Sequence, residues 1–341
     1  MMAVRKFMTM DLKDIVIRGS KKTYYALTHK KFYPPVCDCD RQSSNDKIYN
    51  LLVADNPCMI SRFGTTEINC INNYICVMDK SSSYLKRIFN YISDKTHTPW
   101  WNKDIFQKLY VLSGVFPPTQ ETAEKFSERY LQDVPEIDLL GCHQYYEKFM
   151  PLRKDVIKVQ LEMLYPFFVE RPWTRALKGK NVLVVHPFTE SIQEQYKRRN
   201  MLFENHDVLP EFNLITLKAV QSIGGTCTNY ASWFDALKSM EDKISRIEFD
   251  ICILGCGAYG LPLAAHVKRL GKKAVHLGGG TQLLFGILGK RWMEQYHDTW
   301  HYRPGIDIDI NYRPLFNAYW INPSVSERPV NAGKVENACY W

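Results

Sequence analysis

Residues 249–263 read FDICILGCGAYGLPL, and this stretch decides the fold. Its first part, Phe249 to Leu254, is an apolar run of the length of a strand. Residues 255–260 then form a G-x-G-x-x-G turn, and an apolar helix is predicted from Leu261 to Leu270. Glycines between a strand and a helix let the backbone approach a diphosphate, whose charge is stabilised by the first N–H groups of the helix. The stretch therefore predicts one strand–turn–helix unit of a nucleotide-binding sheet.

The same alternation of strand and helix extends along the chain in both directions. Helices are predicted from residue 65 to about 77, after residues 186–191 as far as 203, and over 233–247. Strands are predicted at 58–63, 137–141, 181–185, 213–220 and 272–277. Strands that are apolar on both faces and alternate with helices are typical of a parallel sheet covered on both sides. We therefore expect a Rossmann-like α/β fold with a mostly parallel sheet, helices on both faces and a ligand at the carboxyl ends of the strands.

The chain is long enough for one large α/β domain. We expect residues 1–45 to form an N-terminal lead-in and residues 46–341 to form a single Rossmann-like domain. Asp46 is predicted to cap the first helix of this domain. A mostly helical insertion is expected at about 84–170, broken by Pro117-Pro118.

The formal net charge is +8, and no nucleic-acid-reading module accompanies it, so no nucleic-acid partner is expected. The positive excess favours anionic ligands such as phosphates, or an acidic membrane surface. No signal peptide and no apolar run long enough to span a bilayer is found, which predicts a cytoplasmic protein that makes at most peripheral membrane contact. The ten cysteines form no C-x-x-C pair, so neither a zinc ribbon nor a thioredoxin-type site is indicated.

A second strand–turn–helix junction reads Arg62-Phe63-Gly64-Thr65-Thr66-Glu67. Arg62 is suited to hold a phosphate with two parallel hydrogen bonds, and the threonines offer hydroxyl and backbone donors. Glu67 is a candidate general base, sugar-hydroxyl ligand or metal ligand. The alternative for Glu67 is plain helix capping, because a carboxylate in the first turn is stabilised by the helix dipole.

Two further strand ends carry candidate residues. His186 ends a strand, where an imidazole is well placed for proton transfer, and a capping box with Glu194 is an alternative explanation for Ser191. Residues 278–282 form a second glycine-rich strand end, explained either by a ligand or by a crowded loop crossing. No carboxylate ends that strand to hold a ribose, which argues against NAD. The pair Asp307 and Asp309 has a D-x-D form that arises readily by chance.

Together these junctions define a candidate site. Glu67 and His186 are its catalytic candidates, and Glu67 is also its candidate metal ligand. The candidate donor-binding residues are Arg62, Gly64, Thr65, Thr66, Ser191, Arg198, Gly255, Gly257, Tyr259, Gly260, Gly279, Gly280, Thr281 and Gln282.

The arrangement of Arg62-Phe63-Gly64 and Glu67 between a strand and a helix resembles the R-F-G-D-G-E entrance of the bacterial GT-D type glycosyltransferases. The remainder, from about residue 50 to 341, is similar to a related set of bacterial and viral polysaccharide-cluster proteins. The stretches that carry this second similarity are 184–188, 219–222, 255–263, 278–286, 290–292 and 339–341. The resemblance implies transfer of a sugar from a nucleoside-diphosphate sugar, assisted by a divalent metal (Mn²⁺ or Mg²⁺), to a glycan or lipid-linked acceptor in polysaccharide synthesis.

One position departs from that pattern. The GT-D family has an aspartate two residues before the glutamate, and this sequence has Thr65 there. Three alternatives follow: a metal held mainly by Glu67, the donor diphosphate and water; catalysis without a metal; or a non-catalytic nucleotide-binding or scaffold protein. A Rossmann methyltransferase or dehydrogenase would use the same glycine turn and would bind S-adenosylmethionine or NAD instead.

Overall fold

The computed structural model describes residues 12–29, 35–226, 228–293 and 311–341. The chain divides into two compact units. The small unit comprises Met1–Phe32 with Asn72–Lys103, and the large unit comprises Tyr33–Ile71 with Asp104–Trp341. The boundary falls inside α3 (Thr65–Met78), and each unit is described by itself.

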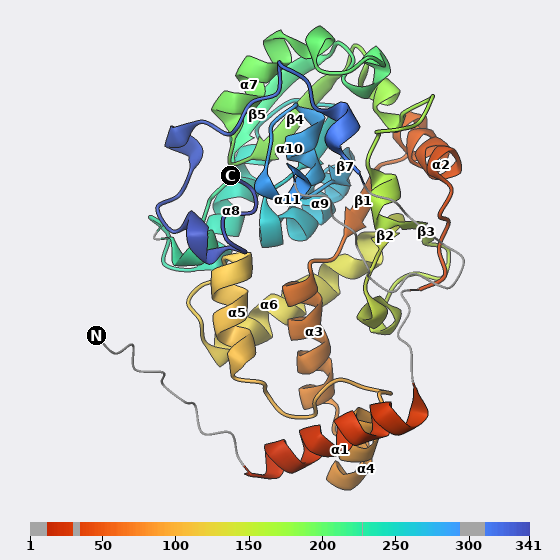
Figure 1. The fold of residues 1–341 in the computed structure, drawn as a ribbon, viewed down its shortest axis with the longest axis vertical. Coiled ribbons are helices and arrows are strands. Elements are labelled where there is room, and N and C mark those ends of the chain that lie inside the picture. The colour runs from red at the N-terminus through yellow and green to blue at the C-terminus, as the bar shows by residue number, and fades with distance from the viewer. Residues whose placement is uncertain (1–11, 30–34, 227, 294–310) are drawn as a thin grey trace. The chain divides into compact units, whose positions relative to one another are not determined.

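The large unit is built on a seven-stranded sheet (Figure 1). All strand pairs are parallel, in the order β3-β2-β1-β7-β6-β4-β5. The strands are β1 (Cys58–Arg62), β2 (Leu139–Cys142), β3 (Ile157–Gln160), β4 (Asn181–His186), β5 (Asn213–Lys218), β6 (Ile251–Leu254) and β7 (Lys273–His276). This confirms the predicted Rossmann-like α/β fold. Six of these seven strands lie at predicted positions, and β3 was not predicted.

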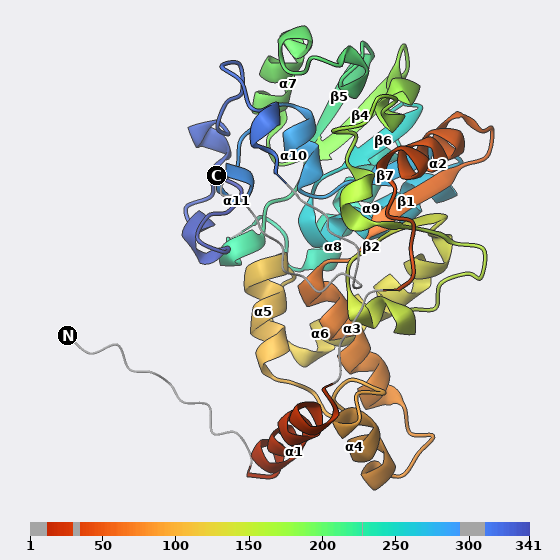
Figure 2. The same ribbon diagram turned by 45° about the vertical axis from the view of Figure 1, so that its right-hand side comes forward.

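Helices cover both faces of this sheet (Figures 1 and 2). Alternate strand residues such as Ile60, Val184 and Ile253 enter a core with α2, α7 and α10. On the opposite face α9 packs against β1, β6 and β7, and α6 and α8 pack against α9. The helices of the large unit, besides the start of α3, are α2 (Arg41–Val53), α5 (Asp104–Ser113), α6 (Gln120–Asp133), α7 (Thr189–Lys197), α8 (Trp233–Ile244), α9 (Gly260–Arg269), α10 (Gly280–Leu284) and α11 (Lys290–Met293).

The start of α2 corrects one prediction. Asp40, not Asp46, caps this helix, and its side chain accepts a hydrogen bond from the Ser43 N–H at 2.6 Å. Asp46 lies within the helix and forms ion pairs with Arg171 and Arg175 at 2.9 and 3.0 Å. The prediction failed because the polar run before Ile48 is itself the beginning of the helix, in which Ser44 and Asn45 are buried.

The small unit consists of α1 (Leu12–Thr28), the end of α3 and α4 (Tyr84–Ile92). Buried Arg87 donates hydrogen bonds to the carbonyls of Cys76, Val77 and Pro99, and so ties α4 to the end of α3 and the loop after α4. Lys21 of α1 forms an ion pair with Asp94 at 3.0 Å. The divisions at residues 32, 72 and 103 differ from the predicted ones at 45, 84 and 170, because residues 104–170 supply α5, α6, β2 and β3 to the large unit.

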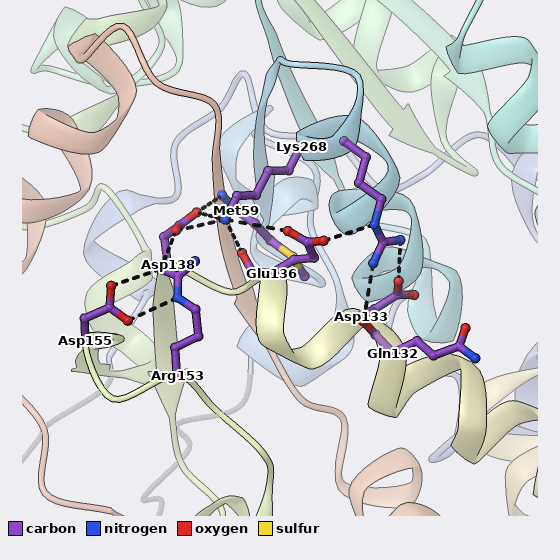
Figure 3. A network of polar contacts seen from close by, with 9 residues as sticks. Met59, Gln132, Asp133, Glu136, Asp138, Arg153, Asp155 and Lys268 are labelled. Atoms are coloured by element: carbon purple, nitrogen blue, oxygen red, sulfur yellow. Dashed lines mark hydrogen bonds and ion pairs between the residues drawn. The ribbon is translucent and has the colours of Figure 1, made fainter.

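A network of charged side chains joins the strands at the amino-terminal edge of the sheet (Figure 3). Asp138, just before β2, accepts a hydrogen bond from the Met59 N–H at 2.8 Å. The same carboxylate pairs with Lys268 of α9 and with Arg153, each at 2.8 Å. One side chain therefore fixes β1, β2, α9 and the loop before β3 together.

Among the helices of the described ranges, none combines the length and the apolar character that crossing a bilayer requires.

Replacing Asp138 with Asn should lower the free energy of unfolding by about 2 kcal/mol, because the amide keeps one acceptor oxygen and turns N–H donors toward Met59, Lys268 or Arg153. Urea unfolding measures this change. Asp155→Asn is the matched control, since Asp155 is largely exposed in the same network and its loss should cost under about 1 kcal/mol. Equal losses in the two variants would contradict the role given to Asp138.

Candidate functional site

A cavity of about 210 Å³ lies at the carboxyl-terminal edge of the sheet, within the large unit. Arg62 ends β1, His276 ends β7, Gly255 follows β6 and His186 ends β4, and all four line it. These are four consecutive strands in the sheet, so the cavity lies where parallel α/β sheets hold their ligands.

The cavity brings most of the predicted site residues together. Those that line it are Arg62, Gly64, Thr65, Thr66, Glu67, His186, Gly255, Gly257, Tyr259, Gly279 and Gln282. Ser191, Arg198, Gly260, Gly280 and Thr281 do not line it.

Four of these five residues lie outside the cavity lining for a reason that the structure shows. The Ser191 hydroxyl donates to the carboxylate of Glu327, and Arg198 lies exposed at the end of α7. A Cβ at Gly260 would overlap the ring of His276, and one at Gly280 would overlap Tyr165. The crowded loop crossing is therefore a sufficient explanation for Gly280, and internal packing explains Gly260.

Several residues line the cavity that were not predicted from the sequence. They include Ser113, Tyr130, Gln221, Ser222, His276, Arg291, Tyr340 and Trp341. His276 carried a usable signal, because it ends a predicted strand just as His186 does. The others reach the cavity from loops, from α5, α6 and α11, or from the C-terminal segment. Five of them lie in the stretches 219–222, 290–292 and 339–341, which carry the resemblance to polysaccharide-cluster proteins but gave no reason to place them in the site.

Arg62 is the central cation of the cavity. In the described part of the chain its guanidinium has no hydrogen-bonded or ion-paired partner, although most other arginines of the large unit do. Gly278, with a φ of +61°, lies beside it, and a Cβ there would be 3.7 Å from the Arg62 Cδ. An arginine without a carboxylate partner at the edge of a cavity favours an anionic ligand.

Glu67, in the first turn of α3, is the buried carboxyl of the cavity. Burial raises its pKa, while Arg62 and a hydrogen bond from Ser113 act in the opposite direction. A Cβ at Gly64 would overlap the carboxyl oxygens, so glycine at that position leaves room for the side chain to fold back toward the start of its helix. A raised carboxyl pKa is typical of a group that exchanges a proton near neutral pH.

His186 is buried, and burial lowers its pKa to about 3. The Phe188 N–H donates to its Nδ1 at 3.0 Å, so Nδ1 is the acceptor and the neutral ring carries its proton on Nε2. His186 is thus a hydrogen-bond donor to the cavity. This tautomer does not suit the general-base role that its strand-end position suggested.

His276 is a second buried, neutral imidazole, and burial together with Arg62 lowers its pKa to about 3. Its Nδ1 lies 3.1 Å from the Ser61 hydroxyl of β1. Gly255 lies against His186 and Gly260 lies against His276, so two glycines of the G-x-G-x-x-G turn make room for the two rings. Gly257 has a φ of +58° and open space where a Cβ would be.

The C-terminal segment closes one side of the cavity. Arg291 donates to the Tyr340 hydroxyl at 3.2 Å and pairs with Glu336, and Gln282 donates to the Tyr340 carbonyl at 2.9 Å. Farther back, buried Glu327 accepts hydrogen bonds from the Glu190 and Ser191 N–H groups at the start of α7. A carboxylate of the chain itself therefore occupies the anion-binding end of α7.

The donor set does not fit a divalent metal. In the described ranges no three His, Cys, Asp or Glu side chains are grouped to hold one. Glu67 offers a single buried carboxyl with a raised pKa, and Glu336 is paired with Arg291. Asp307 and Asp309 lie outside the described residues.

The two histidines should make the protein sensitive to acid. Each of these histidines has a pKa of about 3 in the folded chain and an ordinary pKa of 6.5 in the unfolded chain. Its contribution to stability is therefore complete above pH 6.5. That stability is lost as the pH falls toward 3, and at pH 5 each histidine should already have cost about 2 kcal/mol.

Urea unfolding of the wild type and of His276→Gln between pH 7.5 and about pH 5 tests this expectation. The variant should lose less stability over that range than the wild type, by about 2 kcal/mol. His206→Gln, at an exposed histidine, is the control and should behave as the wild type does. Parallel pH profiles for wild type and His276→Gln would show that the ring is not held neutral.

No protein-family model, no curated protein and no solved structure matches the chain. The cavity itself therefore carries the functional evidence. It brings together one unpaired arginine, two neutral imidazoles and one buried carboxyl at the edge of a parallel sheet.

Proposed function

We propose that the protein is a glycosyltransferase that binds a nucleoside-diphosphate sugar in this cavity and transfers the sugar to a glycan or lipid-linked acceptor. The observation that carries the proposal is that Arg62 and Glu67, a cation and an acid–base group five residues apart in one strand–helix turn, both line the cavity. The resemblance of this turn to the GT-D type enzymes adds to that support.

The first requirement of sugar transfer is stabilisation of the nucleoside diphosphate as it leaves. Arg62 supplies a positive charge that forms no ion pair in the described ranges, and the Nε2–H of His186 is a neutral donor. Fixed donors aimed at developing negative charge are commonly the largest contribution to catalysis. A neutral imidazole also remains a hydrogen-bond donor at every pH above its pKa of about 3.

The second requirement is a group that accepts the proton of the acceptor hydroxyl. As the bond between the sugar carbon and the diphosphate oxygen breaks, the acceptor oxygen bonds to that carbon and its proton passes to the Glu67 carboxylate. A carboxylate whose pKa is raised by burial accepts a proton more readily than an exposed one. No metal is needed for this step as written.

The size of the cavity limits what lies inside it. A volume of about 210 Å³ is below the 300 to 1,000 Å³ of ordinary small-molecule sites, so it suits a sugar with its diphosphate rather than a complete nucleotide sugar. The nucleoside is then expected to lie at the mouth of the cavity.

A reducing, cytoplasmic compartment fits the nine described cysteines, all of them free thiols.

Thermal unfolding with UDP, GDP and CDP and their common sugar conjugates, each with and without Mn²⁺, tests ligand binding. One nucleoside diphosphate and its sugar conjugate should stabilise the protein by about 2.7 kcal/mol at a hundred times the dissociation constant. Arg62→Gln should weaken that binding about 10- to 100-fold, since a charge-assisted hydrogen bond contributes about 1.5 to 3 kcal/mol.

Arg198→Gln is the matched control, because Arg198 is exposed and lies outside the cavity. It should bind as the wild type does. Stabilisation by S-adenosylmethionine or NAD alone would refute the glycosyltransferase and favour a methyltransferase or a dehydrogenase. Binding of a nucleotide sugar without any turnover would leave a nucleotide-binding or scaffold protein.

Glu67→Gln should keep nucleotide affinity and lower turnover by about 10²- to 10⁴-fold, the usual contribution of a general base. Release of nucleoside diphosphate from the stabilising sugar conjugate measures it. The same variant should be more stable than the wild type near neutral pH. A raised carboxyl pKa means that ionisation costs folding free energy as the pH rises through and above the unfolded value of 4.5.

The stability difference between Glu67→Gln and the wild type should therefore widen from pH 5 to pH 8. Melting temperatures at the two pH values are the measurement. A variant that is equally active would remove Glu67 from the mechanism, whereas a variant that is inactive and also less stable at both pH values would point to a structural role.

A further inference from the structure

The small unit presents an apolar helix face to solvent. On α4, Leu85 is 78% exposed and Phe89 is 61% exposed. They are four residues apart, which places them on the same side of the helix. Partly buried Ile88 and Ile92 continue this side, and we call the four residues the α4 face.

The opposite side of α4 is firmly held. Arg87 is buried and donates to three carbonyls, Tyr91 is buried, and Ser83 caps the helix through a hydrogen bond from the Lys86 N–H. The helix therefore has its own packed side, and the α4 face is a second apolar surface that this packing does not use.

Positive charge is concentrated in the same unit. Residues 15–29 and 72–103 contain eight Lys and Arg, two Asp and no Glu, a surplus of six where the whole chain has a surplus of eight. Lys86 and Lys95 flank the α4 face, both are exposed, and the Lys95 ammonium lies 5.8 Å from the centre of the Phe89 ring.

We propose that the α4 face binds the surface of an anionic lipid membrane, with α4 lying in the plane of the interface. Leucine and phenylalanine enter the boundary between headgroups and acyl chains, and the flanking lysines contact acidic headgroups. This inference does not depend on the proposed function, since it concerns a surface of the small unit and not the cavity.

The charge decides between a membrane and the other candidate occupants. A second copy of the chain would bring a surplus of six positive charges against another surplus of six, which is unfavourable. A nucleic acid would match the charge but would make no use of exposed Leu85 and Phe89. An anionic bilayer matches both properties at once.

Co-sedimentation with lipid vesicles tests the proposal, using the full chain. The wild type should bind vesicles in which a third of the lipid is phosphatidylserine, should bind phosphatidylcholine vesicles far less, and should lose affinity as salt is added. The paired substitution Leu85→Ser and Phe89→Ser should weaken binding about 100-fold. Lys86→Glu with Lys95→Glu should weaken it at least about tenfold.

Matched controls come from the large unit. Val325→Ser with Val330→Ser removes side chains that are 90% and 102% exposed, and Lys154→Glu with Lys178→Glu reverses two exposed charges. Both controls should bind as the wild type does, and all variants should keep the wild-type circular dichroism spectrum because every changed residue is exposed.

Three outcomes would overturn the proposal. The first is wild-type protein that binds neither kind of vesicle. The second is control pairs that weaken binding as much as the α4 pairs do, because attraction would then be spread over the whole chain. The third is a dimer, seen by sedimentation, that the Leu85→Ser and Phe89→Ser pair dissociates while vesicle binding is absent.

Discussion

In a sheet of parallel strands every strand brings its last residue to the same edge, and the candidate site depends on this constraint. Arg62, His276, Gly255 and His186 come from four distant parts of the sequence, yet they line one cavity because β1, β7, β6 and β4 are neighbours. The two imidazoles and the Glu67 carboxyl are buried at this edge. Burial consequently disfavours the charged forms of both imidazoles and of Glu67, which lowers the pKa of each histidine and raises that of the carboxyl.

The arrangement lowers stability at some pH values. Two buried histidines weaken the fold in acid, and a buried carboxyl with a raised pKa weakens it when it is ionised. The glycines follow from the same packing. Gly255 and Gly260 leave room for the rings of His186 and His276, whereas Gly257 faces open space. In the G-x-G-x-x-G turn, Gly255 and Gly260 are therefore required by packing, whereas Gly257 leaves its backbone open to a ligand.

Much of the fold was predictable because buried strands such as Asn181–His186 and Ile251–Leu254 are continuous apolar runs. β3 was missed because its sequence, Ile-Lys-Val-Gln, alternates and is only half buried. Most of the residues predicted from strand ends line the cavity, although they make up less than half of its lining. Tyr340 and Glu327 were beyond prediction, since their positions depend on contacts with residues far away in the sequence. For the same reason nothing local showed that Glu327 holds Ser191 outside the cavity.

The strand order also bears on how the chain is made. β1 pairs with β7, and the Ser61–His276 contact between them spans 215 residues. A growing chain on the ribosome exposes one side of β1 until β7 has emerged, whereas β4, β5 and β6 find one another over shorter separations. Unpaired strand edges of this kind are where nascent chains aggregate. Expression at low temperature or with added chaperones should therefore improve the yield of this protein more than that of a sheet with local pairings.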